Sequence, residues 1–385
     1  MSGPATGPAG SAPLLDVASY RNEAVEPPGY CDFARFGPPT RSVLERDRVE
    51  LARISTGGTD CDELVPYRDE AQRLVASLTG RREPDQVVMV PSTSAGLFQL
   101  AFALPSRSGD ELLVSPAEFP ANVYPWVRAA SRGGPAVRWL ESAGGLVTPD
   151  AVARSLTPRT VGLAVSAVDS RTGYRVDLPA LREVLGGRLL LVDAVQGFGV
   201  ADLDWSVADA VVAGGQKWLR AGWGTGFISV SDSAVDRLSD ELTGWTGVEE
   251  PTTYDARLHA ALPSAARLAM TNPDLVAVAR LATALGLVAT CTVHAIEAVV
   301  RERVGQLREV VVRRGGEMLV EIAPERSAGI LAFSVPGRAG AEVGAALARR
   351  GITCSIRADH VRLSPHASTP DDTVCLVDEA LASLR

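Results

Sequence analysis

Short, continuously apolar runs alternate with stretches of helical spacing between residues 87 and 230, and this pattern constrains the fold most. Helices are predicted at residues 93–103, 149–155 and 178–185. Strands that are apolar on both faces and separated by helices are typical of an α/β fold with a mostly parallel sheet covered by helices. The predicted strands are 87–90, 111–114, 135–140, 160–165, 189–192, 210–213 and 225–230.

The rest of the chain predicts a loose N-terminal segment and a smaller C-terminal domain. Residues 1–25 are expected to be disordered or loosely packed. Residues 41–78 have helical spacing, and a long helical stretch at 273–314 is interrupted near Cys291. Shorter units then follow at 318–322, 328–335, 339–350 and 361–364, before a last helix at 370–384 capped by Ser368 or Thr369. We therefore predict a large domain over residues 26–275 and an α+β domain over 276–385.

Composition and charge narrow the class of protein. The 385 residues are 46% hydrophobic, and the net charge of −8 favours a cytoplasmic enzyme over a nucleic-acid-binding protein. No apolar run reaches the length of a membrane span, and the first residues lack the features of a signal peptide. The five cysteines and four histidines show no metal-ligand spacing, so we expect reduced thiols and no metal.

The chain has a single lysine, Lys217, whereas the other 37 of its 38 basic residues are arginines. An amine can lose its proton and attack a carbonyl, but a guanidinium stays protonated. Lys217 follows a predicted strand and two glycines that allow close backbone approach. This context predicts Schiff-base chemistry, with an ordinary surface lysine as the alternative.

Three further features lie at the ends of predicted strands, where open α/β sheets bind ligands. Asp193 ends a fully apolar strand and could hold a pyridinium N–H, or serve as a helix cap or in a buried ion pair. Thr93 and Ser94 open a helix whose free amides suit a phosphate, although ordinary capping is the alternative. Phe119 could stack on a planar cofactor or pack in the core.

Two motifs carry a resemblance to a known family. Asp193-Ala-Val-Gln196 is similar to a D-x-x-Q/H motif, and Gly-Gly-Gln-Lys217-Trp resembles the segment whose lysine binds the cofactor covalently. From about Cys31 to the end, the chain resembles the class V aminotransferase-like group of fold-type I enzymes dependent on pyridoxal 5′-phosphate (PLP). That group includes cysteine desulfurases, isopenicillin-N-epimerase-like proteins and kynureninases.

The resemblance implies a role for each matching residue. Thr93 and Ser94 match the phosphate-binding turn, Phe119 the stacking position, and Asp193 the partner of the ring nitrogen. Gln196 matches the residue near the phenolic oxygen of the ring, and Gln216 lies where relatives contact the phosphate.

Later segments resemble the parts of the family that complete the site. Thr271 matches a threonine that reaches the phosphate in the neighbouring subunit, which implies a homodimer with shared active sites. Arg362 matches the arginine that binds the α-carboxylate of an amino-acid substrate. Arg35 lies in the segment lining the substrate mouth and could meet a second anionic group, or be a solvated arginine.

Departures from the family bear on the reaction type. Cys354 precedes Arg362 too closely for the mobile loop of a cysteine desulfurase, and Ala167 replaces a usual asparagine or histidine. His366 is expected on a surface loop. We favour a C–S lyase-like β-elimination in specialised metabolism. Transamination, epimerisation, and decarboxylation or oxidative deamination remain alternatives, as does a non-catalytic PLP-fold binding protein.

Overall fold

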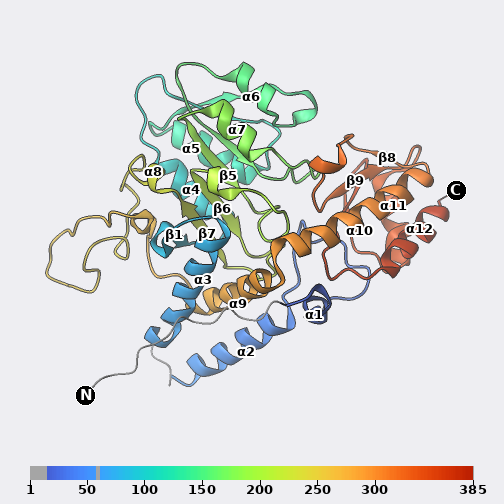
Figure 1. Ribbon diagram of the computed structural model, residues 1–385, viewed down its shortest axis with the longest axis horizontal. Helices are drawn as coiled ribbons and strands as arrows, with labels where there is room; N and C mark the ends of the chain where they lie inside the picture. Colours follow the sequence, from blue (N-terminus) through green and yellow to red (C-terminus); the bar gives the residue numbers. More distant parts are fainter. Residues whose placement is uncertain (1–14, 58–60, 385) are drawn as a thin grey trace.

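A seven-stranded sheet forms the centre of the larger lobe in the computed structural model, which describes residues 15–57 and 61–384 (Figure 1). The strand order is β1-β7-β6-β5-β4-β2-β3. β7 runs antiparallel to both of its neighbours, β1 and β6, and the other four strand pairs are parallel, so the predicted mostly parallel arrangement is confirmed. The strands are β1 (Val87–Met89), β2 (Glu111–Val114), β3 (Ala136–Trp139), β4 (Thr160–Ser166), β5 (Leu189–Asp193), β6 (Ala210–Gly214) and β7 (Gly226–Val230).

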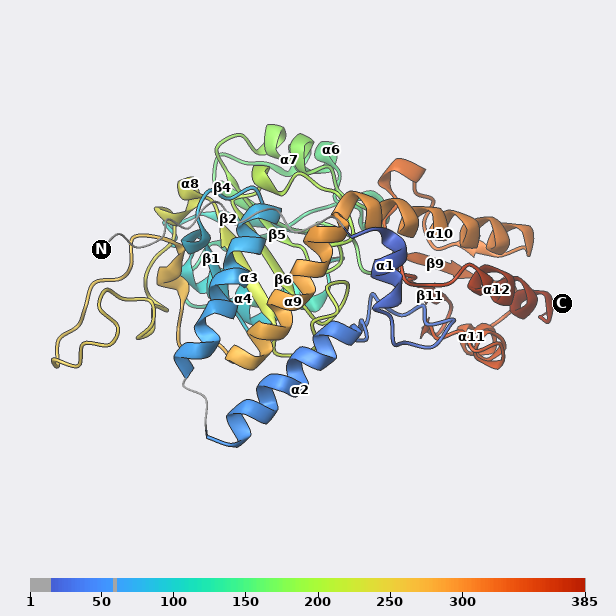
Figure 2. The same cartoon turned by 60° about the horizontal axis from the view of Figure 1, so that its bottom comes forward.

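Helices cover both faces of this sheet (Figure 2). Along β5, Leu189 and Leu191 pack into one apolar cluster, while Leu190 and Val192 pack into the other, as the alternation of a strand requires. One cluster is completed by α4 (Thr93–Ala103), α5 (Tyr124–Ala130) and α8 (Asp232–Val235). The other is completed by α3 (Val65–Leu78), α6 (Pro149–Ser155), α7 (Leu178–Leu185) and α9 (Leu275–Cys291).

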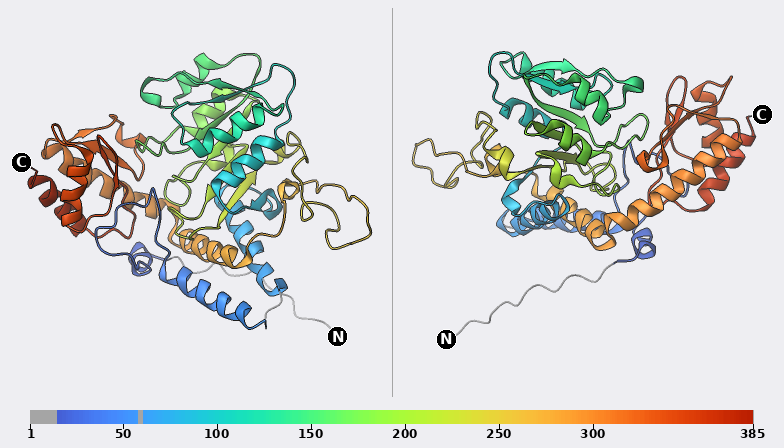
Figure 3. Two further views of the ribbon diagram at one scale, coloured as in Figure 1. Left: turned by 180° about the vertical axis from the view of Figure 1, so that it is seen from behind. Right: turned by 45° about the horizontal axis from the view of Figure 1, so that its top comes forward.

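The smaller lobe contains a four-stranded antiparallel sheet in the order β10-β11-β9-β8 (Figure 3). Its strands are β8 (Glu317–Met318), β9 (Leu331–Ser334), β10 (Ser355–Ile356) and β11 (Val361–Leu363). Its helices are α10 (Val293–Arg313), α11 (Gly340–Arg349) and α12 (Asp372–Ala382). The predicted unit at 318–322 keeps only Met318 in a strand. The division into domains at residues 275 and 276 remains a prediction.

The long helical stretch breaks close to the expected position. α9 ends at Cys291, α10 begins at Val293, and the two helices meet at 81°. Thr292 between them has φ +69 and caps α10 through its hydroxyl group. In the described part of the chain no single helix has the length and apolar character of a membrane span; this bent pair meets both criteria only when taken together.

The N-terminal segment packs against both lobes. Residues 1–14 of the segment expected to be loose lie outside the described residues, but α1 (Val17–Asn22) follows and buries Tyr20, so the expectation of loose packing is wrong there. Further on, Tyr30 and Asp32 form isolated β-bridges with Thr353 and Ser364 of the smaller lobe. α2 (Arg41–Ser55) then packs along α9.

The cap of the last helix differs from the prediction. The N-cap of α12 is Asp371, not Ser368 or Thr369. The hydroxyl of Ser368 donates to Glu26, and that of Thr369 accepts from the amide of His366, so both are engaged elsewhere. Short 3-10 helices complete the described secondary structure at Cys61–Leu64, Pro84–Gln86, Pro120–Asn122, Ala143–Gly145, Trp205–Val207, Ala265–Leu268 and Pro324–Arg326.

Candidate active site

Lys217 and Asp193 come together at the carboxyl edge of the large sheet. β5 ends at Asp193 and the parallel strand β6 ends at Gly214, just before Lys217. Burial raises the pKa of Asp193 to about 6, because the residue is only 3% exposed. Burial lowers the pKa of Lys217 to about 8, although the charge of Asp193 opposes this shift. The single amine of the chain is therefore closer to deprotonation at neutral pH than an ordinary lysine.

A cleft of about 670 Å³ opens in front of Lys217. Six of the predicted cofactor- and substrate-binding residues line it: Arg35, Phe119, Gln196, Gln216, Lys217 and Arg362. They come from both lobes and from the N-terminal segment. The remaining lining residues are Ala34, Ser170, Trp223, Cys354, Ser355, Ile356 and Arg357.

Phe119 presents its ring to this cleft instead of packing in the core. The residue is 54% exposed, and Nζ of Lys217 lies 5.6 Å from the centroid of the ring. An exposed ring this close to a reactive amine is available for stacking on a flat ligand.

The N-terminus of α4 lies beside the end of β6. Its cap is Ser92, whose hydroxyl accepts from the amide of Ala95, so neither Thr93 nor Ser94 is the cap. The hydroxyl of Thr93 is buried and has no hydrogen-bond partner among the described residues, while Ser94 is exposed. A Cβ on Gly214 would lie 3.0 Å from this hydroxyl and 2.3 Å from Oε1 of Gln216, which explains the glycine. The site thus offers an unused donor and free helix amides.

Gln196 is fixed from two sides. Its Nε2 donates to the carbonyl of Ala34 at 2.9 Å, and its Oε1 accepts from Nε1 of Trp218 at 2.8 Å. Because an amide nitrogen carries two hydrogens, one donor of Gln196 remains for a ligand.

Arg362 is held rigidly on β11. Nη1 donates to the carbonyl of Ser170 at 2.6 Å, and Nη2 donates to Oγ of Ser355 at 3.0 Å. Ser355 in turn donates to the carboxylate of Asp32, which lies 3.7 Å from Nη2 of Arg362. Nε of Arg362 is buried and has no partner in the described structure. This fixed guanidinium faces the same cleft as Lys217.

Thr271 is not brought to this cleft. It is exposed, accepts a hydrogen bond from Nε1 of Trp245 at 3.3 Å, and lines a separate hollow with Met89 and Asn272. Arg35, by contrast, is an exposed side chain at the cleft.

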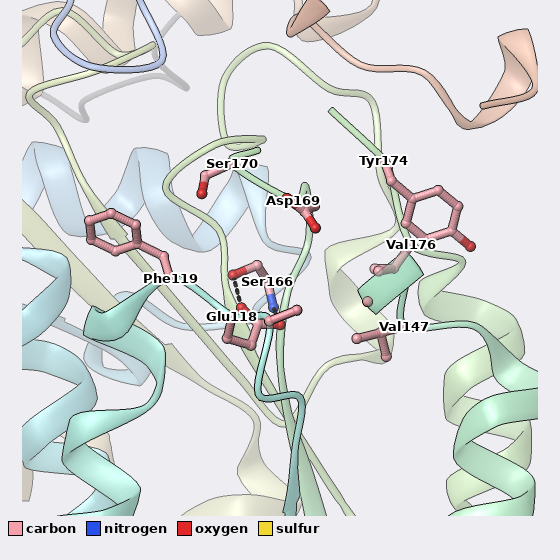
Figure 4. Close-up of a pocket in the computed structure, with 10 residues that line it drawn as sticks. Glu118, Phe119, Val147, Ser166, Asp169, Ser170, Tyr174 and Val176 are labelled. Carbon is pink, nitrogen blue, oxygen red and sulfur yellow. Dashed lines mark hydrogen bonds between the residues drawn. The ribbon is translucent and has the colours of Figure 1, made fainter. Parts of the chain in front are cut away.

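The sequence reasoning missed Glu118, which lies directly before Phe119. It accepts hydrogen bonds from both the amide and the hydroxyl of Ser166, at the end of β4 (Figure 4). Burial raises the pKa of Glu118 to about 7, and the charge of Asp193 adds to this shift. The sequence signal that could have indicated Glu118 is an acidic residue after a buried strand. The same signal indicated Asp193.

The expectation of a surface position for His366 is wrong. The ring is fully buried between Tyr20, Phe33 and Trp218, and Nε2 lies 3.3 Å from the carbonyl of Trp218. Burial lowers the pKa of His366 to about 3, so the ring is neutral. The His366 ring therefore packs against Trp218, the residue that follows Lys217.

Cys354 lines the cleft near Arg362. Burial raises the pKa of its thiol to about 11, so little thiolate exists at neutral pH. Ala167 is buried and adds no polar side-chain contact to the site.

Fold and cleft define an α/β enzyme with a reactive lysine at the carboxyl edge of its sheet. A family model described as Aminotransferase class-V matches residues 62–363. The chain belongs to this family.

Curated relatives agree with this assignment. The chain is 27% identical to the uncharacterized aminotransferase YcbU of Bacillus subtilis, over 84% of this chain and 86% of that protein. It is 27% identical to isopenicillin N epimerase of Streptomyces clavuligerus, over 78% of this chain and 79% of that protein. It is 26% identical to the cysteine desulfurase CsdA of Escherichia coli, over 89% of this chain and 85% of that protein.

Solved structures show the same fold. A mutant of C-DES with glycine covalently linked to its PLP cofactor has a TM-score of 0.85 at 19% identity, covering 94% of this chain and 98% of that one. The cystine C–S lyase C-DES with its product cysteine persulfide has a TM-score of 0.83 at 19% identity, covering 92% and 97%. The chain therefore has the predicted fold of a fold-type I enzyme, and its cofactor is PLP.

Proposed function

We propose that Lys217 binds PLP covalently and that six residues around it hold the cofactor. Asp193 would bind the ring nitrogen, Phe119 would stack on the ring, and Gln196 would donate to the phenolic oxygen. The unpartnered hydroxyl of Thr93 supports a phosphate site at the start of α4, with Ser94 and Gln216 beside it. These residues fit the group, because its ring nitrogen, phenolic oxygen and phosphate each have a matching group in the cleft or beside it.

We infer that Arg362 binds the α-carboxylate of the amino-acid substrate. Its guanidinium is oriented by Ser170 and Ser355, so little side-chain freedom is lost on binding. Bound PLP withdraws electrons from the Cα of the substrate. Once the substrate amine has displaced it from the cofactor, the amine of Lys217, whose pKa burial lowers to about 8, would be free to take the proton from Cα as the general base. The observation that carries this assignment is that Arg362 and Lys217 line one cleft.

The reaction that we propose is a C–S lyase-like β-elimination, in which loss of the Cα proton is followed by departure of a thiol from Cβ. Relatives named as cysteine desulfurases and a cystine C–S lyase support sulfur chemistry. A desulfurase cysteine has to attack as a thiolate, but burial raises the pKa of Cys354 to about 11. This difference favours release of the sulfur product over its transfer to the enzyme.

We also propose a homodimer with shared sites. Thr271 is exposed and lies outside the cleft of its own protomer, as expected of a residue that completes the phosphate site of a partner. Sedimentation of wild-type protein and of Thr271→Ala, followed by PLP titration, tests this proposal. We expect a dimer in both cases and weaker PLP binding in the variant; a monomeric enzyme with full PLP affinity contradicts it.

The function is tested with the holoenzyme and a panel of amino acids and cysteine S-conjugates. Release of pyruvate and thiol is the expected result. Formation of pyridoxamine phosphate would identify a transaminase, solvent deuterium at Cα of retained substrate an epimerase, and loss of CO₂ a decarboxylase. Lys217→Ala should lose both the visible absorption of bound cofactor and the activity. Arg349→Ala, on the exposed face of α11, is the matched control.

A further inference from the structure

The charged residues that line the Lys217 cleft are all cations. They are Arg35, Lys217, Arg357 and Arg362, and no aspartate or glutamate lines the cleft among the described residues. Two acids lie just outside this lining: Asp32, which accepts from Ser355 and lies 3.7 Å from Arg362, and Asp193, whose charge acts on Lys217. With Lys217 bound to the cofactor, the three arginines still give the lining an excess of positive charge, which attracts anionic ligands.

Two of these cations are not needed for the α-carboxylate. Arg362 suffices for one carboxylate, because a guanidinium binds it in a bidentate fashion. Arg35 forms no ion pair within residues 15–57 and 61–384. Arg357 donates to the carbonyl of Ile356 at 3.0 Å, and the described structure pairs it with no carboxylate. Many other arginines of this chain are paired, as Arg175 is with Glu297 and Arg182 with Asp209.

Arg35 and Arg357 both lie within electrostatic reach of Arg362. Arg35 follows the N-terminal strand-like segment and Arg357 follows β10, and the charges of both act on Arg362. The cleft lining also includes the apolar side chains of Phe119, Trp223 and Ile356, which are 46–65% exposed.

We propose that Arg35 and Arg357 form a second anion subsite and that the substrate is an amino acid whose side chain ends in a carboxylate or another acid. This inference rests on the proposed function, because it takes Arg362 as the site of the α-carboxylate. For a lyase, the substrate class is a cysteine S-conjugate with an acidic S-substituent.

Binding is tested with two ligands that cannot react, because they lack the amino group. They are 3-(carboxymethylthio)propanoate and its carbamoylmethyl counterpart, which has the same shape and one charge fewer. Calorimetric titration of the holoenzyme should show roughly tenfold tighter binding of the diacid, the scale of one charge-assisted hydrogen bond. The preference should disappear in the double variant Arg35→Gln/Arg357→Gln and persist in Arg349→Gln. Equal affinities in the wild type, or a preference that survives in the double variant, overturn the proposal.

Turnover separates this inference from the proposed function. Thiol release is compared for S-carboxymethyl-L-cysteine and S-carbamoylmethyl-L-cysteine. A binding preference without thiol release from either conjugate supports the subsite and refutes the lyase. Thiol release with equal kcat/KM and no binding preference supports the lyase and refutes the subsite.

Discussion

Arg220, three residues after Lys217, forms a buried ion pair with Glu26 of the N-terminal segment. Its Nε also donates to the carbonyl of Pro38 at 2.8 Å, and its Nη1 donates to Oγ of Ser368 at 3.1 Å. The backbone of Arg220 has φ +60, a conformation that side chains disfavour. The Arg220 guanidinium thus links the segment that carries Lys217 to Glu26 and Pro38 of the N-terminal segment and to Ser368, which precedes α12.

Removing the acidic partner should destabilise the protein strongly. Glu26→Ala leaves a fully buried guanidinium without its counter-charge, and we expect a loss of about 3–5 kcal/mol in the free energy of unfolding. Urea denaturation of the apoprotein measures this loss. Glu45→Ala, which breaks the solvent-exposed pair with Arg48, is the matched control and should change stability little. If both substitutions lower the free energy of unfolding by the same amount, the buried pair contributes no more to stability than the exposed pair.

The lowered pKa of Lys217 predicts how fast the apoprotein takes up PLP at different pH values. Burial disfavours the charged amine, so its pKa falls to about 8 and the reactive neutral form accumulates earlier than in an ordinary lysine. The rate constant should rise about tenfold per pH unit at low pH and level off above about pH 8. Stopped-flow absorbance between pH 6 and pH 10 measures it. A rate that keeps rising to pH 10 is inconsistent with a buried amine.

The raised pKa of Asp193 predicts that replacing this residue stabilises the protein by an amount that depends on pH. Burial raises its pKa to about 6 in the folded protein, compared with about 3.9 in an unfolded chain. The folded state therefore binds the proton more tightly, and ionisation destabilises it progressively as the pH rises from about 4 to about 6. Above that range Asp193→Asn should stabilise the apoprotein by about 2–3 kcal/mol, with no gain at pH 4.

Denaturant unfolding of the apoprotein at pH 4 and pH 8 checks this difference, with Asp236→Asn on an exposed turn as the control. The same Asp193→Asn substitution should reduce kcat strongly, because an amide cannot hold a protonated pyridine nitrogen. A variant that is more stable and fully active would remove Asp193 from the cofactor site.

Local patterns predicted the parts of the fold that depend on neighbours in the chain. α4, α6 and α7 begin and end where the helical spacing placed them. Asp193 and Lys217 meet because the carboxyl ends of adjacent parallel strands share one edge of a sheet, which strand order alone determines.

Contacts between distant segments were not predictable in this way. Nothing near Glu26 in the sequence indicates that it meets Arg220, because their pairing depends on how the N-terminal segment crosses the lysine segment. His366 lies next to prolines and polar residues typical of a surface loop, yet Tyr20 and Phe33 bury it from elsewhere in the chain. Burial of such residues is decided by tertiary packing, on which local composition carries no information.

Cys354 provides the sharpest distinction between a lyase and a desulfurase. Burial raises the pKa of its thiol to about 11, so the nucleophilic thiolate is scarce at neutral pH. Cys354→Ala should therefore retain kcat for thiol release within about twofold, since truncating a half-buried thiol removes little packing and no reacting group. Cys375→Ala, at an exposed position on α12, controls for general effects of losing a cysteine. Loss of activity in Cys354→Ala alone, with a persulfide detected on the wild-type enzyme by mass spectrometry, would instead assign the chain to sulfur transfer through Cys354.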